Sequence, residues 1–172
     1  MKNFTNRLVI VVLFFAVTIY LPAQVTVVGH ITAEVVSTLT ATESSQLSFG
    51  QFSPETAGGQ IILTPQGIRS SNGTVNVIGG MHIPGSFIVT GEPDALISIQ
   101  LPSGPTTLTN SGNSGTMTVT SWMSDPPQHS SVTIPASGAQ PINVGATLIV
   151  GTNQDNPIGL YTGTYNITFN YN

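Results

Sequence analysis

Apolar and polar residues alternate along the end of the chain, residues 159–172. From residue 161 onward, Tyr, Ile, Phe and one Gly occupy the odd positions, and Thr and Asn occupy the even positions. Because successive side chains of a β-strand point to opposite faces, this alternation predicts a half-buried strand over residues 161–171. The side chains that we expect on its buried face are Tyr161, Tyr165, Ile167, Phe169 and Tyr171.

A second alternating stretch occupies residues 25–41, with mostly Val, Ile, Ala and Leu at odd positions and mostly Thr, His and Glu at even ones. A typical strand has only about 5–6 residues, so we expect a break near Gly29. The break would separate an N-terminal extension, residues 24–28, from a first strand over residues 29–40. The pattern of the extension suits insertion into the sheet of another molecule, with Val25 and Val27 as the inserted side chains.

The rest of the chain alternates between short β-prone runs and turn residues. Runs rich in Val, Ile, Thr and Phe are separated by Gly, Pro, Asn and Ser, and no stretch beyond residue 23 shows helical spacing of apolar residues. Strands at intervals of about 8–12 residues are typical of an all-β sandwich or barrel. We therefore predict an antiparallel, immunoglobulin-like β-sandwich, formed as one domain by residues 24–172.

The first residues have the pattern of a secretory signal peptide. Lys2 and Arg7 precede an uncharged apolar run over residues 8–21, and Ala23 offers a cleavage point. The run is shorter than the about 20 residues of a membrane-spanning helix, although a membrane anchor remains the alternative. We expect residues 1–23 to be removed, no transmembrane segment to remain, and the protein to be exported to the periplasm, the cell surface or the medium.

Charge is scarce. Charged residues make up 6% of the chain, against about 25% in an ordinary soluble domain. Once Lys2 and Arg7 are removed, Arg69 is the sole Lys or Arg beside seven acidic residues. Phosphate backbones require several cationic contacts, so we expect no nucleic-acid partner. The chain contains no Cys, so its sandwich must be stable without disulfides.

No residue pattern indicates catalysis or a cofactor. His30, His82 and His129 are isolated, without spacing for metal ligation. Asp125, His129 and Ser130 share one segment, but adjacency along the chain does not build a catalytic triad. We predict that the protein is not an enzyme and that it carries no metal or cofactor.

Two further features have both a structural and a functional interpretation. Trp122 is the sole Trp; a core position is favoured over an exposed one that stacks on a sugar. Glu92 and Asp94 flank Pro93, where a polar turn is favoured over a calcium site.

Several motifs, in order along the chain, resemble those of a bacterial secreted family catalogued as domain-of-unknown-function family 4402. They are ITA at residues 31–33, LTAT at 39–42, LSFG at 47–50, FIVTGEP at 87–93 and the alternating end at 159–172. The family name states no function.

The end of the chain also resembles subunits of chaperone–usher pili. Tyr171 is penultimate and Gly159 is fourteenth from the end, as in the closing strand of such pilins. The resemblance implies a sandwich that lacks its last strand, which a periplasmic chaperone lends and the N-terminal extension of the next subunit then replaces. The chain departs from many pilins in lacking a disulfide and in the shortness of residues 24–28.

We therefore expect a non-enzymatic, fimbria-like or surface-assembling structural subunit. Its partners would be other subunits and a periplasmic chaperone. Its assembly residues would be Val25, Val27, Gly159, Tyr161, Tyr165, Ile167, Phe169 and Tyr171. The alternative is a monomeric secreted or periplasmic binding module, for example for a glycan, that uses the loops at residues 91–94 or 125–129.

Overall fold

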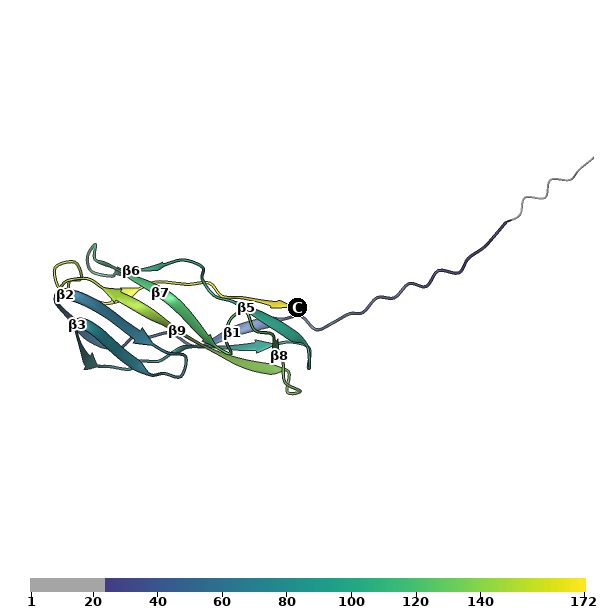
Figure 1. Ribbon diagram of the computed structural model, residues 1–172, viewed down its shortest axis with the longest axis horizontal. Helices are drawn as coiled ribbons and strands as arrows, with labels where there is room; N and C mark the ends of the chain where they lie inside the picture. The colour runs from purple at the N-terminus through teal and green to yellow at the C-terminus, as the bar shows by residue number, and fades with distance from the viewer. Residues whose placement is uncertain (1–23) are drawn as a thin grey trace, which may run out of the picture. The chain divides into compact units, whose positions relative to one another are not determined.

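A computed structural model describes residues 24–172 of the chain (Figure 1). The predicted signal peptide, residues 1–23, lies outside the described residues. The chain divides into two units, Met1–Val35 and Val36–Asn172, and each is described here by itself.

Residues 24–172 form strands and no helix, which confirms the all-β prediction. No helix of the described part is long and apolar enough to cross a membrane. The strands are β1 (Thr40–Ser45), β2 (Gln51–Leu63), β3 (Arg69–Gly79), β4 (Gly85–Thr90), β5 (Leu96–Gln100), β6 (Thr106–Asn110), β7 (Thr116–Asp125), β8 (Val132–Thr133), β9 (Ala139–Val150), β10 (Tyr161–Thr162) and β11 (Thr168–Tyr171).

The strands pair antiparallel in two sheets. The larger sheet has the order β1-β4-β9-β7-β6-β10, and β2 pairs with both β9 and β3. The smaller sheet has the order β11-β5-β8. The long strand β9 organises the larger sheet, because its first half pairs with β4, its second half pairs with β2, and β7 lies along its other edge.

The core lies between the sheets and is built by period-two alternation. In β9, Leu148 and Val150 are buried whereas Ile149 between them is 41% exposed. In β5, Ile97 and Ile99 are buried and Ser98 is not. The inward rows of the two sheets join in one hydrophobic cluster, as expected for a β-sandwich.

Arg69 is committed to a structural role. Its Nη1 donates hydrogen bonds to the backbone oxygens of Phe49, at 2.8 Å, and Gly79, at 3.1 Å. The guanidinium thereby ties the start of β3 to its end and to the segment before β2.

The predicted strand boundaries need two corrections at the alternating stretches. The strand predicted over residues 29–40 is wrong, because no strand within residues 24–172 begins before Thr40. The strand predicted over residues 161–171 is divided into β10, which pairs with β6, and β11, which pairs with β5. Alternation shows that a segment suits a strand, but only a neighbouring strand supplies the hydrogen bonds that define one.

Substitutions at two neighbouring positions of β9 test which face of this strand lies in the core. We expect Leu148→Ala to lower the free energy of unfolding by about 2–5 kcal/mol, because it opens a cavity in the core. Ile149→Ala is the matched control on the opposite face and should cost about 1 kcal/mol or less. Urea unfolding of both variants measures the difference; equal losses would contradict the assignment of faces.

Candidate functional site

Residues 24–35 form the first part of the candidate site, and we call them the arm. No strand is assigned to the arm, and each of its side chains is exposed. Its apolar side chains at odd positions include Val25 at 83% exposure, Ile31 at 97% and Val35 at 98%. The arm therefore carries an apolar row at strand spacing that is not covered by the rest of the described chain.

The arm is longer than the extension predicted at residues 24–28. Val25 and Val27 lie in it as expected, and Ile31 and Val35 continue the same odd-numbered row. The signal for these two was present, because the alternation continues past Gly29. The expected break at Gly29 concealed it.

The C-terminal segment, residues 159–172, provides the second part of the site. All the apolar side chains predicted on one face, Tyr161, Tyr165, Ile167, Phe169 and Tyr171, are half-buried and pack against the core. The Thr and Asn side chains between them are exposed. Residues 163–167 take part in no strand pairing, so the segment contributes to both sheets without being fully paired in either.

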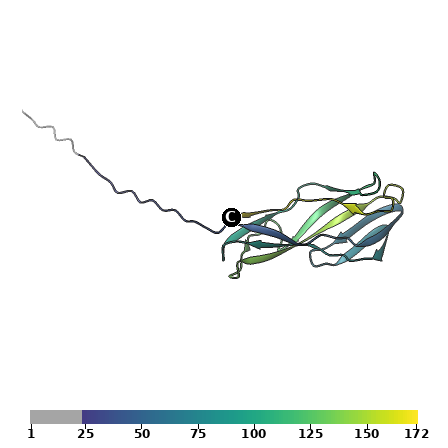
Figure 2. The ribbon, with the colours of Figure 1, turned by 180° about the vertical axis from the view of Figure 1, so that it is seen from behind.

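The free edges of β1 and β11 are the third part. Within the described residues, β1 pairs only with β4, and β11 pairs only with β5. In both views of the molecule the C-terminal end of β11 lies close to the beginning of β1 (Figures 1 and 2). Each of these strands leaves a row of backbone groups on one side that no described strand uses.

Aromatic side chains connect the C-terminal segment with β4, the neighbour of β1. The ring of Phe87 lies 6.3 Å from that of Tyr165, edge to face, and 6.3 Å from that of Phe169. Phe87, Tyr165 and Phe169 are only half-buried, although they face the core. The aromatic rings between β4 and β11 are therefore only partly covered by the described residues.

Tyr165 has a buried hydroxyl and packs against the core. Its ring stacks on Trp122 at 4.6 Å, and burial, with a smaller effect of Glu43, raises the pKa of its hydroxyl to about 12. The hydroxyl has no hydrogen-bond partner in the described chain. It lies against Gly85, where an added Cβ would collide with it.

Tyr171 ties the end of β11 to the segment from which the arm emerges. Its hydroxyl donates a hydrogen bond to the backbone oxygen of Ser37 at 3.0 Å and accepts one from the backbone N–H of Glu92 at 2.8 Å. The carboxylate of Glu92 accepts hydrogen bonds from the Ser37 hydroxyl at 2.6 Å and from its N–H at 3.2 Å. We call this set of contacts the Ser37 clamp.

The clamp also explains the state of Glu92. The hydroxyl of Ser37, and then its backbone N–H, lower the pKa of the Glu92 carboxyl below its ordinary value of 4.5. Sequence reasoning placed Glu92 in a polar turn and did not connect it with Ser37, because no local pattern relates residues so far apart in the chain.

The remaining predicted residues stabilise the turn before β10. Gly159 lies directly against the side chain of Asn110, where a Cβ would not fit. Asn110 in turn donates to the backbone oxygen of Pro157, and the Tyr161 hydroxyl donates to the same oxygen at 2.8 Å. Gly159 and Tyr161 therefore position the C-terminal segment and lie away from the clamp.

In the segment that contains Asp125, His129 and Ser130, two of these side chains are engaged in other hydrogen bonds. Asp125 accepts a hydrogen bond from the Gln66 amide, and the Ser130 hydroxyl donates to the backbone oxygen of Pro127. Within residues 24–172, no cluster of three or more His, Cys, Asp or Glu side chains is placed to hold a metal ion.

Comparison with known proteins gives one match. The family model described as Domain of unknown function (DUF4402) matches residues 39–171, which confirms that resemblance and leaves the arm outside the match. No curated protein and no solved structure matches the chain.

We expect the hydrogen bonds between Ser37 and Glu92 to depend on pH. Because the pKa of Glu92 is lowered, its hydrogen bonds contribute to stability at neutral pH and are lost as the pH falls through a midpoint below 4.5. We expect the amide resonance of Ser37 in NMR spectra to titrate with that midpoint and Glu92→Gln to remove the titration.

Thr152 provides the internal control for this titration, since its amide donates to Asp155, whose pKa is also lowered. Its titration should persist in Glu92→Gln. A Ser37 amide that still titrates in that variant would contradict the clamp.

Proposed function

The chain belongs to the Domain of unknown function (DUF4402) family, and we propose that it is an exported, non-enzymatic structural subunit that joins copies of itself by strand complementation. The arm is the observation that carries this proposal. It presents Val25, Val27, Ile31 and Val35 at 82% exposure or more, at the spacing of a strand face. Such a row gains stability only when another surface covers it.

The arm has the properties of a donor strand. An added strand binds through main-chain hydrogen bonds, and its alternate side chains fill pockets. Full burial of a Val or Ile side chain contributes about 1.5–3 kcal/mol. Glu34 is the one acidic residue of the arm, and the arm contains no Lys or Arg. Because Glu34 lies in the even-numbered row, the odd-numbered apolar row can enter a core without burying its carboxylate.

The acceptor that we propose is the side of the sandwich between β1 and β11. The free edge of β11, and the unpaired residues 163–167 before it, offer backbone hydrogen-bonding groups. The half-buried row of Tyr165, Ile167 and Phe169 offers apolar surface beside that edge. An inserted strand would complete both the hydrogen bonding and the burial.

The Ser37 clamp is compatible with a donor from a second copy. The clamp uses both the N–H and the C=O of Ser37. Insertion of the arm into the next copy needs neither group and leaves the clamp intact.

Export and further partners complete the proposal. Export rests on the signal peptide predicted at residues 1–23, and leads to the periplasm, the cell surface or the medium. The resemblance to chaperone–usher subunits implies a periplasmic chaperone that occupies the acceptor before assembly. The immunoglobulin-like and pilin-like character of the sandwich belongs to this proposal as well.

Aspartate substitutions on the two opposite faces of the arm test whether its odd-numbered row is buried in the acceptor. We expect the pair Val27→Asp and Ile31→Asp to abolish polymers, because a buried carboxylate would face the core of the acceptor. The pair Thr26→Asp and Thr32→Asp adds the same charge to the same segment on the opposite face and should still assemble. Size-exclusion chromatography with light scattering distinguishes polymer from monomer.

A peptide of residues 24–35 provides an independent measurement. Added to protein that lacks these residues, it should raise the melting temperature, by an amount equivalent to about 2.7 kcal/mol at a hundredfold excess over its Kd. Peptide with Asp at positions 27 and 31 is the control. A stable monomer that retains its arm and is unaffected by the peptide would contradict complementation and favour the monomeric binding module.

A further inference from the structure

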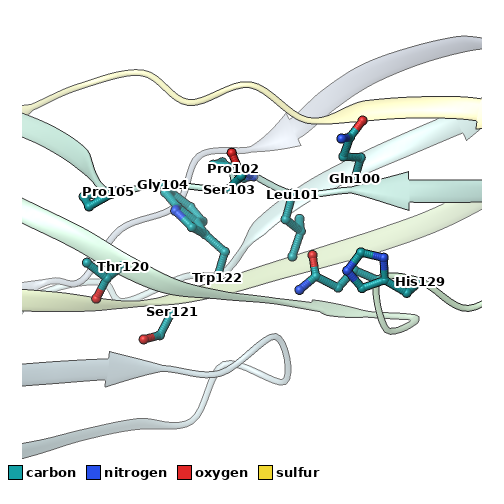
Figure 3. Close-up of a pocket in the computed structure, with 11 residues that line it drawn as sticks. Gln100, Leu101, Pro102, Ser103, Gly104, Pro105, Thr120, Ser121, Trp122 and His129 are labelled. Carbon is teal, nitrogen blue, oxygen red and sulfur yellow. The ribbon is translucent and has the colours of Figure 1, made fainter.

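A cavity of about 440 Å³, open to solvent, lies beside Trp122 (Figure 3). It is distinct from the proposed acceptor, although Trp122 also stacks on Tyr165, which belongs to that acceptor. It is bounded by the segment that follows β5, by an irregular part of β7 and by the loop after β7. Its volume falls within the range of small-molecule sites, about 300–1,000 Å³.

A β-bulge places Trp122 at this cavity. The pairing of β7 with β9 shifts register between Thr120 and Met123, and Ser121 within the shift has a φ of 50°. A bulge redirects the side chains of a strand, and bulges are frequent next to binding sites. His129, which also lines the cavity, has a φ of 64°. Residues with side chains rarely adopt this left-handed backbone, and such strain concentrates at functional sites.

The cavity has an apolar floor and a polar rim. Leu101 and Trp122 are buried, and their side chains enter the space from opposite sides (Figure 3). The side chains of Gln100 and His129 are exposed at the rim, and Gln128 is half-buried. No Lys, Arg, Asp or Glu lines the cavity.

Trp122 also belongs to the core, as the sequence favoured. It is 9% exposed, its ring stacks on that of Tyr165 at 4.6 Å, and its indole Nε1 is buried without a hydrogen-bond partner among the described residues. What Trp122 presents to the cavity is therefore apolar ring surface and not its N–H group.

We propose that this cavity binds a neutral sugar in its pyranose form. The C–H face of a pyranose is apolar and suits the floor of Leu101 and Trp122, while its hydroxyls suit the amides of Gln100 and Gln128. An anionic sugar would find no cation in the lining, and a purely apolar ligand would leave the rim amides without partners. Sequence reasoning considered Trp122 and the loop at residues 125–129 separately; the fold brings them to one cavity.

The chain offers a direct probe, because Trp122 is its sole tryptophan. The purified protein is titrated with methyl pyranosides of neutral hexoses and N-acetylhexosamines while tryptophan fluorescence is recorded. We expect a saturable change with at least one of them and none with glucuronic or sialic acid. Immobilised neutral polysaccharides, tested in parallel, distinguish a site for free sugars from one for sugars within a polymer.

Variants at the rim provide the structural control. Gln100→Ala and Gln128→Ala remove one amide each and should weaken binding about tenfold without unfolding the protein. Gln154→Ala, at an exposed turn outside this cavity, should bind as the unmodified protein does. The proposal is overturned if no neutral sugar changes the fluorescence, if acidic sugars bind instead, or if the rim variants bind normally. Because Tyr165 of the proposed acceptor stacks on Trp122, the sugar titration is repeated with the Val27→Asp and Ile31→Asp variant, and a response that persists there is separate from assembly.

Discussion

The backbone hydrogen bonding of the strands is the constraint on which the rest of this structure depends. A strand inside a sheet needs a neighbour on each side, and β1 and β11 have one each among the described residues. In the proposed assembly, the half-buried aromatic rings beside β11 and the exposed apolar row of the arm belong to the same incomplete state. In that assembly one added strand would pair with the free backbone edge, cover the half-buried rings and bury the apolar row of the arm, because it supplies hydrogen bonds and apolar surface together.

The scarcity of charge determines how such an assembly is held together. With one Arg beyond residue 23, and that Arg bound to backbone oxygens, ion pairs have little to contribute to contact between copies. Recognition would rest on strand register and on the fit of side chains, which ionic strength hardly affects. The exposed apolar arm is also a template for uncontrolled pairing. If the protein assembles as we propose, its arm needs to be bound or shielded until it reaches the next copy.

The sequence predicted the parts of the fold that depend on local alternation. The buried face of the C-terminal segment, from Tyr161 to Tyr171, is as expected, and so is the all-β class. Alternation did not reveal that this segment leaves one sheet after Thr162 and joins the other at Thr168, since that depends on β6 and β5 as neighbours. The same limit applies to residues 29–39, where the strand pattern is present but a partner is lacking among the described residues. The contacts of Ser37 with Glu92 and Tyr171, and the cavity beside Trp122, are products of tertiary structure that single-sequence patterns do not carry.

Arg69 has a consequence for the exported protein that we propose. A trypsin-like protease requires Lys or Arg before the bond that it cleaves, and beyond residue 23 the chain offers that side chain only at position 69. This position lies at the start of β3, paired with Leu63 of β2, and its guanidinium is bound to Phe49 and Gly79. The exposed arm, the part of a chain that proteases attack most readily, contains no Lys or Arg. The same shortage of cations that leaves acidic residues as nearly all the charges beyond residue 23 therefore makes the arm durable among proteases of this specificity.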